Sequence, residues 1–219
     1  MTKDRILFST SSSRVMAQAV DGSSASISRR LSGVKGDAGK VNDVYVHGQV
    51  KDCKRHVIFF GGDVQDYPEN MEKHRDNRRY KEWSTEATAA KVLGKFPQSL
   101  VFVVKPSRMH LLTFAVYSNF VETSDFGNPS HSCDFGAVKH LSGLYSSAVG
   151  EVYDAEGADG PSDDTPVSVV GFSKGCVVLN QIVFELPSVE KDSCLQRFLS
   201  KITEFHWLDG GHSGGPDNT

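Results

Sequence analysis

Short apolar runs alternate with longer amphipathic stretches through most of this chain. Three runs consist almost wholly of apolar residues and stop close to a glycine or proline: residues 56–60, 100–104 and 167–170. Runs of this kind are typical of strands that are buried on both faces of a parallel sheet. Two further strands are expected at residues 41–46 and 203–208.

Between these strands the apolar residues recur at every third or fourth position, which predicts helices. Ser84 and Asp134 are the expected N-caps of the first two helices. The third helix is apolar on nearly every side, so it should be buried, and Pro187 should end it. The four predicted helices cover residues 84–94, 134–149, 174–186 and 190–200.

Strands that alternate with helices of this length imply βαβ units and therefore an α/β fold, with a mostly parallel sheet and helices on both faces. Ligands bind to such sheets outside the carboxyl ends of the strands. Gly61, Gly171 and Gly210 each lie at such an end. We therefore expect the three glycine-containing stretches to converge on one rim of the sheet.

Composition and charge narrow the class of protein. The chain has 219 residues, of which 38% are hydrophobic, as in an ordinary soluble globular protein. Its net charge of −3 gives no reason to expect nucleic acid or an anionic membrane as the main partner. Four widely spaced cysteines without a C-x-x-C pair indicate thiols rather than a disulfide framework or a zinc site. No stretch is apolar enough to span a membrane, and no cofactor or metal is expected.

The predicted domain covers residues 41–219, with a separate segment before it and an acidic segment within it. Residues 1–40 are rich in serine and carry four arginines, which predicts either a disordered tail or a weak mitochondrial transit peptide. Three aspartates in that segment count against the transit peptide. Residues 151–165 hold six acidic residues and no basic one, which predicts an acidic surface loop.

The candidate chemistry lies at residues 171–175, Gly-Phe-Ser-Lys-Gly, between a predicted strand and a predicted helix. In that context G-x-S-x-G indicates a nucleophile elbow, with Ser173 raised above the sheet at the start of a helix. An oxyanion hole requires two backbone N–H donors. The expected donors are Lys174, which follows the serine, and the loop at Gly62 and Asp63.

A serine nucleophile also needs a base and an acid that orients the base. Ser173, Asp209 and His212 follow the chain order of an α/β-hydrolase triad. His212 could reach the serine only if the glycine-rich loop folded back, and the alternative role for Asp209 is to cap that loop. A zinc site formed by His206, Asp209 and His212 is disfavoured, because residues 206 and 209 of an extended strand point to opposite faces.

Several segments together resemble one family, that of the human chromosome 2 open reading frame 69 protein. The resemblance runs from about residue 41 to the C-terminus. It implies an α/β-hydrolase-like fold, a serine hydrolase without an established substrate, and mitochondrial residence. On this resemblance Ser173 is the elbow serine, and Asp209 and His212 belong to a Leu-Asp-Gly-Gly-His-Ser-Gly-Gly motif. The segments are residues 56–65, 107–111, 134–141, 171–181 and 207–215.

Members of that family continue well past the last motif, through further strands and a region that contains a histidine. We therefore expect a truncated chain, with a partial α/β-hydrolase-like domain that lacks the last strands and whose activity depends on the missing region. The expected function is hydrolysis of an ester, thioester or amide of a small acyl substrate. The alternative is a non-catalytic hydrolase-like scaffold that binds a protein partner in mitochondria. A cytoplasmic location is the alternative to the mitochondrial one.

Overall fold

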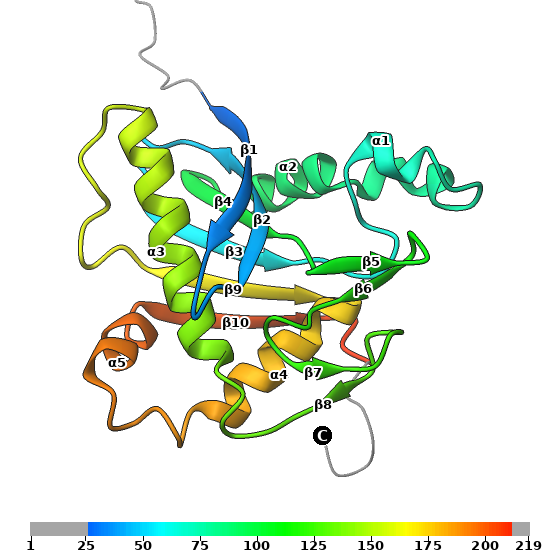
Figure 1. Cartoon of the computed structure of the whole chain (residues 1–219). Helices are drawn as coiled ribbons and strands as arrows, with labels where there is room; N and C mark the ends of the chain where they lie inside the picture. Colours follow the sequence, from blue (N-terminus) through cyan, green and yellow to red (C-terminus); the bar gives the residue numbers. More distant parts are fainter. Residues whose placement is uncertain (1–25, 212–219) are drawn as a thin grey trace, which may run out of the picture.

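The computed structural model of the chain describes residues 26–211, and these form one α/β domain around a six-stranded sheet (Figure 1). The strands lie in the order β1-β2-β4-β3-β9-β10. The last four are parallel to one another, whereas β1 and β2 are antiparallel to their neighbours. The strands are β1 Ile27–Lys35, β2 Val41–Gly48, β3 Arg55–Phe60, β4 Ser99–Val104, β9 Val167–Phe172 and β10 Ile202–Leu208.

Helices cover both faces of this sheet, as predicted. Helix α2 lies on one face, and α3, α4 and α5 lie on the other (Figure 1). The helical segments are α1 Pro68–Met71, η1 Asn77–Trp83, α2 Thr85–Lys95, α3 Ala137–Ala155, η2 Ser173–Gly175, α4 Cys176–Glu185 and α5 Ser193–Leu199. Two small hairpins project beyond the carboxyl ends of the parallel strands: β5 Arg108–His110 with β6 Phe114–Val116, and β7 Glu122–Thr123 with β8 Pro129–Ser130.

The central strands are buried on both faces because their successive side chains enter two different cores. Ile58 and Phe60 of β3 belong to the core under α3 and α4. Val57 and Phe59 of the same strand belong to a smaller core under α2. The fully apolar runs that predicted parallel strands are explained by this arrangement, and the predicted α/β class is confirmed.

The prediction of a tail at residues 1–40 is wrong for residues 27–35, which form the edge strand β1. In this strand Leu31 and Val34 are buried, while most of the other side chains face solvent. The two buried residues are three positions apart because the register shifts between them, at Gly33, whose φ is +64°. One face of this edge strand is exposed to solvent, and the register shift breaks the alternation of buried and exposed side chains. The sequence therefore shows little apolar periodicity and resembles that of a disordered tail. Residues 1–25 lie outside the described part of the chain.

Two helix boundaries also differ from the prediction. Helix α3 continues to Ala155, so the first part of the predicted acidic loop at residues 151–165 is helical. The burial of Val152 and Tyr153 accounts for this extension. Asp134 does not cap α3, which begins at Ala137.

A buried carboxylate on another helix caps α3 instead. Glu185 of α4 accepts hydrogen bonds from the backbone N–H groups of Gly136, Ala137 and Val138, at 2.9, 2.8 and 2.9 Å. Only 1% of Glu185 is exposed. A carboxylate at a helix N-terminus satisfies the free N–H groups of the first turn and complements the helix dipole. This contact therefore fixes α3 to α4, the helix that follows Ser173.

All four cysteines are free, as predicted. No helix within residues 26–211 combines the length and the apolar character that a bilayer crossing requires.

Two buried histidines should make the stability of this fold depend on pH. His56 contacts the hydroxyl groups of Tyr145 and Tyr153, at 2.7 and 3.1 Å. His140 accepts the N–H of Asp37 at Nδ1 (3.1 Å), so its Nε2–H donates to Asn42 (2.8 Å). Burial is the largest cause that lowers the pKa of each histidine to about 4. Both imidazoles are therefore neutral in the folded protein at neutral pH.

Above about pH 6.5 we expect the two histidines to add no pH dependence to the free energy of unfolding. As the pH drops from there to about 4, we expect them to lower it. In that window the unfolded chain takes up two protons that the folded chain excludes, which predicts a slope of about 2.7 kcal/mol per pH unit. Urea unfolding across this range measures the slope. His56→Phe should reduce the slope by about half, and an unchanged slope in this variant would show that His56 does not contribute.

Candidate active site

Ser173 lies at the turn between β9 and α4, in a conformation that marks a nucleophile elbow. Its φ is +51°, a left-handed value that residues with side chains rarely adopt. The side chain is half-buried. Strain of this kind persists only where the surrounding structure enforces it, and such positions concentrate at functional sites.

The two glycines of the motif are required by close packing. A Cβ atom on Gly171 would lie 2.9 Å from the Cα atom of Cys176, at the start of α4. A Cβ atom on Gly175 would lie 2.1 Å from the carbonyl oxygen of Phe60, at the end of β3. The elbow is therefore pressed against both its own helix and the neighbouring strand, which holds Ser173 in place.

The predicted convergence on one rim is confirmed. A Cβ atom on Gly62 would lie 2.9 Å from the Cβ atom of Ser173, so the loop after β3 passes directly beside the serine. A Cβ atom on Gly210 would lie 3.6 Å from the sulfur of Cys176. The stretches at the ends of β3, β9 and β10 thus meet at the start of α4.

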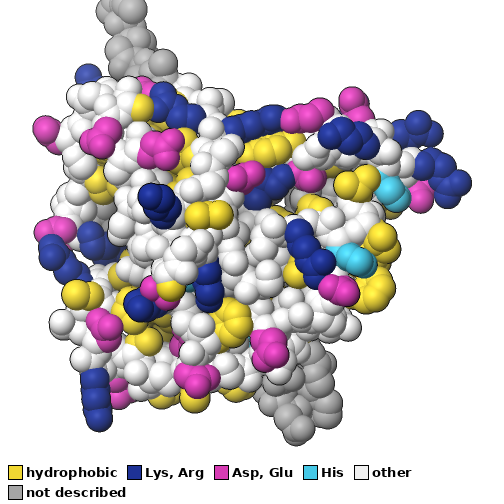
Figure 2. Space-filling model, viewed as in Figure 1, with side chains coloured by type: hydrophobic (Ala, Val, Ile, Leu, Met, Phe, Trp, Pro, Cys, Tyr) yellow, Lys and Arg dark blue, Asp and Glu magenta, His cyan; other side chains and the backbone are white. Residues whose placement is uncertain are grey.

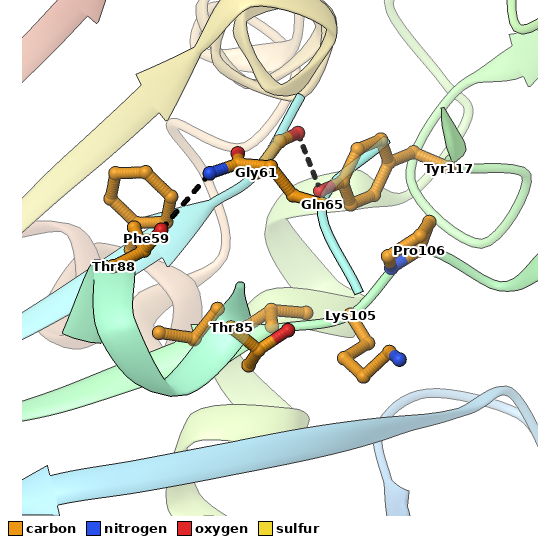
Figure 3. Close-up of a pocket in the computed structure, with 10 residues that line it drawn as sticks. Phe59, Gly61, Gln65, Thr85, Thr88, Lys105, Pro106 and Tyr117 are labelled. Carbon is orange, nitrogen blue, oxygen red and sulfur yellow. Dashed lines mark hydrogen bonds between the residues drawn. The ribbon is translucent and has the colours of Figure 1, made fainter. Parts of the chain in front are cut away.

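One of the three predicted oxyanion donors is already engaged. The Gly62 N–H donates to Oε1 of Gln65 at 2.7 Å. Nε2 of Gln65 in turn donates to the carbonyl of Trp83 and to Oγ1 of Thr88, each at 3.0 Å, and the bond to Thr88 is drawn in Figure 3. Gln65 therefore ties the loop to α2 and removes the Gly62 N–H from the set of available donors.

The other two predicted donors remain available within the described part of the chain. The Asp63 N–H forms no hydrogen bond among residues 26–211, whereas its carboxylate accepts the N–H of Ala115 at 2.8 Å. Lys174 is in the first turn after the elbow, where backbone N–H groups lack intrahelical acceptors. Its side chain is buried, with Cδ 3.4 Å from the position of a Cβ atom on Gly127.

A buried tyrosine also holds the same loop. The Tyr117 hydroxyl donates to the carbonyl of Gly61 at 2.9 Å (Figure 3). Burial raises the pKa of Tyr117, so the hydroxyl stays a donor. The cavity between Tyr117, Gln65 and Lys105 has a volume of about 10 Å³, which is room for about one water molecule and not for a substrate.

Lys105, which lines this cavity, forms a buried ion pair with Asp66 that no sequence pattern predicted. The two side chains are 11% and 10% exposed. Burial lowers the pKa of Lys105 to about 8, and its ammonium lies 4.0 Å from the centre of the Tyr67 ring. Because Asp66 follows the loop and Lys105 follows β4, the pair fixes the carboxyl ends of two strands to each other.

Asp209 directly follows β10 and is exposed, with a φ of +53°. Burial raises the pKa of the Cys176 thiol, and the nearby charge of Asp209 raises it further despite the hydrogen bond to the Leu208 carbonyl. Cys176 is therefore a neutral thiol beside the rim. His212 lies outside the described residues, so the acid and base roles of Asp209 and His212 stay predictions.

A larger apolar groove of about 200 Å³ lies next to the elbow, between α2 and the last two strands. Phe172, which precedes Ser173, stacks on Trp83 along its wall, with ring centres 5.8 Å apart. Leu208, which precedes Asp209, also lines it. Among residues 26–211 no three or more His, Cys, Asp or Glu side chains are grouped to hold a metal ion.

The strand order, the helices on both faces and the strained serine between β9 and α4 define an α/β-hydrolase-like protein. The family model C2orf69 matches residues 30–160 and 151–219. The chain therefore belongs to the C2orf69 family.

Two relatives illustrate the match. The chain is 37% identical over 226 residues to the mitochondrial protein C2orf69 homolog of Danio rerio, across 91% of this chain and 66% of that protein. It is 37% identical over 207 residues to mitochondrial protein C2orf69 of Homo sapiens, across 74% of this chain and 54% of that protein. The chain thus spans less than two thirds of the length of these relatives.

Among solved structures, the chain is similar to an α-amino acid ester hydrolase (TM-score 0.39, 10% identity, 76% of this chain and 24% of that chain). It is also similar to a cold-adapted esterase from an Arctic intertidal metagenomic library (TM-score 0.35, 13% identity, 91% and 93% of the two chains). At these values the assignment of the fold depends on the topology and the elbow.

Proposed function

We propose that this chain carries the nucleophile and the oxyanion hole of a mitochondrial serine hydrolase that acts on an ester, thioester or amide. The observation that carries the proposal is the left-handed Ser173 between β9 and α4, with the Gly62 backbone beside its Cβ atom. The mitochondrial assignment follows the names of the relatives.

In the proposed reaction the Ser173 oxygen attacks the carbonyl carbon while a base takes the hydroxyl proton. The carbonyl oxygen gains the negative charge, and the N–H groups of Asp63 and Lys174 stabilise it. Collapse of this intermediate breaks the bond to the leaving group, which receives the proton, and water then hydrolyses the acyl-enzyme. Asp209 and His212 are the proposed acid and base.

A fluorophosphonate probe tests the nucleophile, because a serine oxygen that is activated by a base displaces fluoride from the probe and becomes phosphonylated. We expect labelling of this chain, which contains the proposed base His212, and of the full-length Danio rerio relative. Ser173→Ala, or the same change at the matching serine of the relative, should abolish the labelling. Ser200→Ala at the end of α5 is the control and should leave it unchanged. Labelling that persists in the alanine variants would refute the role of Ser173.

A non-catalytic scaffold that binds a protein partner is the second candidate. The engagement of the Gly62 N–H by Gln65 favours it, because a donor expected at the oxyanion hole is used internally. The two candidates differ in cells that lack the native protein. Rescue by a folded form of the full-length relative with alanine at the serine that matches Ser173 would support the scaffold, and failure to rescue would support the hydrolase.

A further inference from the structure

The turn at the tip of the β5–β6 hairpin carries residues that its conformation disfavours. The Thr113 N–H donates to the carbonyl of His110 at 3.0 Å and closes a four-residue turn. Its two central residues, Leu111 and Leu112, have φ values of +51° and +59°. Two successive positive φ values define a type I′ turn, in which Asn-Gly is strongly preferred and leucine is strained.

These leucines do not contribute to the core. Leu111 is 65% exposed and Leu112 is 45% exposed. Phe126, from the neighbouring β7–β8 hairpin, is 51% exposed and packs edge-on against His110 and Phe114, with ring centres 5.1 and 5.3 Å apart. Exposed leucines at strained positions bring no benefit to folding, which points to a contact outside the chain. We call Leu111, Leu112 and Phe126 the apolar tip.

A basic segment lies beside the apolar tip. Residues 73–79 contain four basic residues and one acidic residue, Asp76, which pairs with Arg75 at 3.3 Å. Asn77, at the centre of this segment, donates from its side chain to the carbonyl of Leu112 at 2.6 Å. Arg78 and Arg79 are exposed and form no ion pair within residues 26–211. In Figure 2, Lys and Arg side chains gather on the projecting right-hand part of the molecule, with an apolar patch directly below them.

The apolar tip is also connected to the candidate active site. The Val64 N–H donates to the carbonyl of Thr113 at 2.7 Å, and the Ala115 N–H donates to the carboxylate of Asp63 at 2.8 Å. Both contacts join the hairpin to the loop that passes beside Ser173. A surface bound by the tip would therefore lie next to the rim of the sheet.

We propose that this surface binds an anionic lipid bilayer, with the apolar tip inserted at the interface and Arg78 and Arg79 on the lipid headgroups. A projecting apolar turn needs no matching pocket in a bilayer, whereas a protein partner would have to supply one. Apolar insertion combined with cationic side chains is the pair of signals that gives stable binding to anionic membranes. Nucleic acid would use the arginines but gains nothing from exposed leucines. The net charge of −3 is that of the whole chain, so it does not reveal the basic segment beside the apolar tip.

Co-sedimentation with vesicles tests the proposal without requiring catalysis. The probes are phosphatidylcholine vesicles that contain phosphatidylglycerol, and vesicles of phosphatidylcholine alone. We expect the protein to bind the anionic vesicles more tightly. Leu111→Asn with Leu112→Gly supplies the preferred type I′ residues, so it should raise the temperature of unfolding while it weakens vesicle binding by about tenfold or more. This variant separates loss of binding from loss of folding.

Two matched controls complete the design. Val183→Ser with Phe184→Ser removes two apolar side chains of α4 that are 42% and 39% exposed, and it should leave vesicle binding unchanged. Arg78→Gln with Arg79→Gln should weaken binding to anionic vesicles by roughly tenfold or more. Lys35→Gln with Lys51→Gln, which removes two exposed cations elsewhere on the surface, should leave the binding unchanged.

Three results would overturn the proposal. The first is no binding to either kind of vesicle. The second is binding by the Asn-Gly variant that equals that of the wild type. The third is binding that responds only to the arginine changes and is competed by RNA, which would indicate adsorption to any polyanion. None of these results depends on whether Ser173 is a nucleophile.

Discussion

Gly175→Ala is expected to lower the free energy of unfolding by about 3 kcal/mol or more, or to prevent folding altogether. The new Cβ atom would lie 2.1 Å from the carbonyl oxygen of Phe60, 2.6 Å from its carbonyl carbon and 2.8 Å from the carbonyl oxygen of Gly61. All three are backbone atoms, so relief of the clash requires β3 to separate from the start of α4. The φ of Gly175 is −62°, which alanine adopts freely, so the effect isolates the clash from backbone strain.

Gly150→Ala is the matched control for this substitution. Gly150 lies within α3, and a Cβ atom there would have no neighbour within 4 Å. Alanine at an open helical position should stabilise the protein by about 0.5–1 kcal/mol. Urea unfolding measures both variants. Wild-type stability in Gly175→Ala would show that the elbow is not pressed against β3, and it would weaken the assignment of the site.

The second large effect is expected for Glu185→Ala, which should cost about 3–5 kcal/mol. The substitution removes the acceptor of three N–H groups at the start of α3, of which those of Ala137 and Val138 are buried and that of Gly136 is partly buried. It also removes one of the two acceptors of the Gln181 side-chain amide, at 2.8 Å, and leaves the carbonyl of Ser132 as the other. Because the contact joins α3 to α4, the loss should also loosen the helix that follows Ser173.

Glu185→Gln separates the charge from the hydrogen bonds. Its carbonyl oxygen can still accept two N–H groups, whereas its amide nitrogen would face the third donor, so an intermediate loss is expected. Glu190→Ala removes an exposed carboxylate and should change the stability by no more than about 0.5 kcal/mol. A Glu185→Ala variant as stable as the Glu190→Ala control would contradict the proposed cap.

Local pattern was sufficient for the central part of the fold. The apolar runs at β3, β4 and β9 predicted buried parallel strands, and Ser84 was correctly predicted as the cap of α2, since its hydroxyl accepts the N–H of Ala87. The spacing of Gly171, Ser173 and Gly175 predicted a strand, a tight turn and a helix, and the structure has them at those positions. These features are readable because each depends on residues that are neighbours in the sequence.

Contacts between distant residues could not be read in this way. Glu185 caps a helix that begins 48 residues earlier, and no local pattern in either segment records that contact. Gln65 is only three residues from Gly62, yet the direction of its side chain depends on Thr88 and Trp83 of another segment. For this reason the sequence did not predict that the Gly62 N–H, expected to be an oxyanion donor, is engaged by Gln65.

The sequence by itself determined that the protein is α/β, that its strands are mostly parallel, and that Ser173 stands at the bend between a strand and a helix. The tertiary structure alone decided that β1 completes the edge of the sheet, that the Gly62 N–H is occupied, and that Leu111 and Leu112 project beside Arg78 and Arg79. Periodicity records how deeply each side of an element is buried, because burial selects for apolar residues. It does not show which distant group contacts a given donor or surface, because that depends on how the whole chain folds.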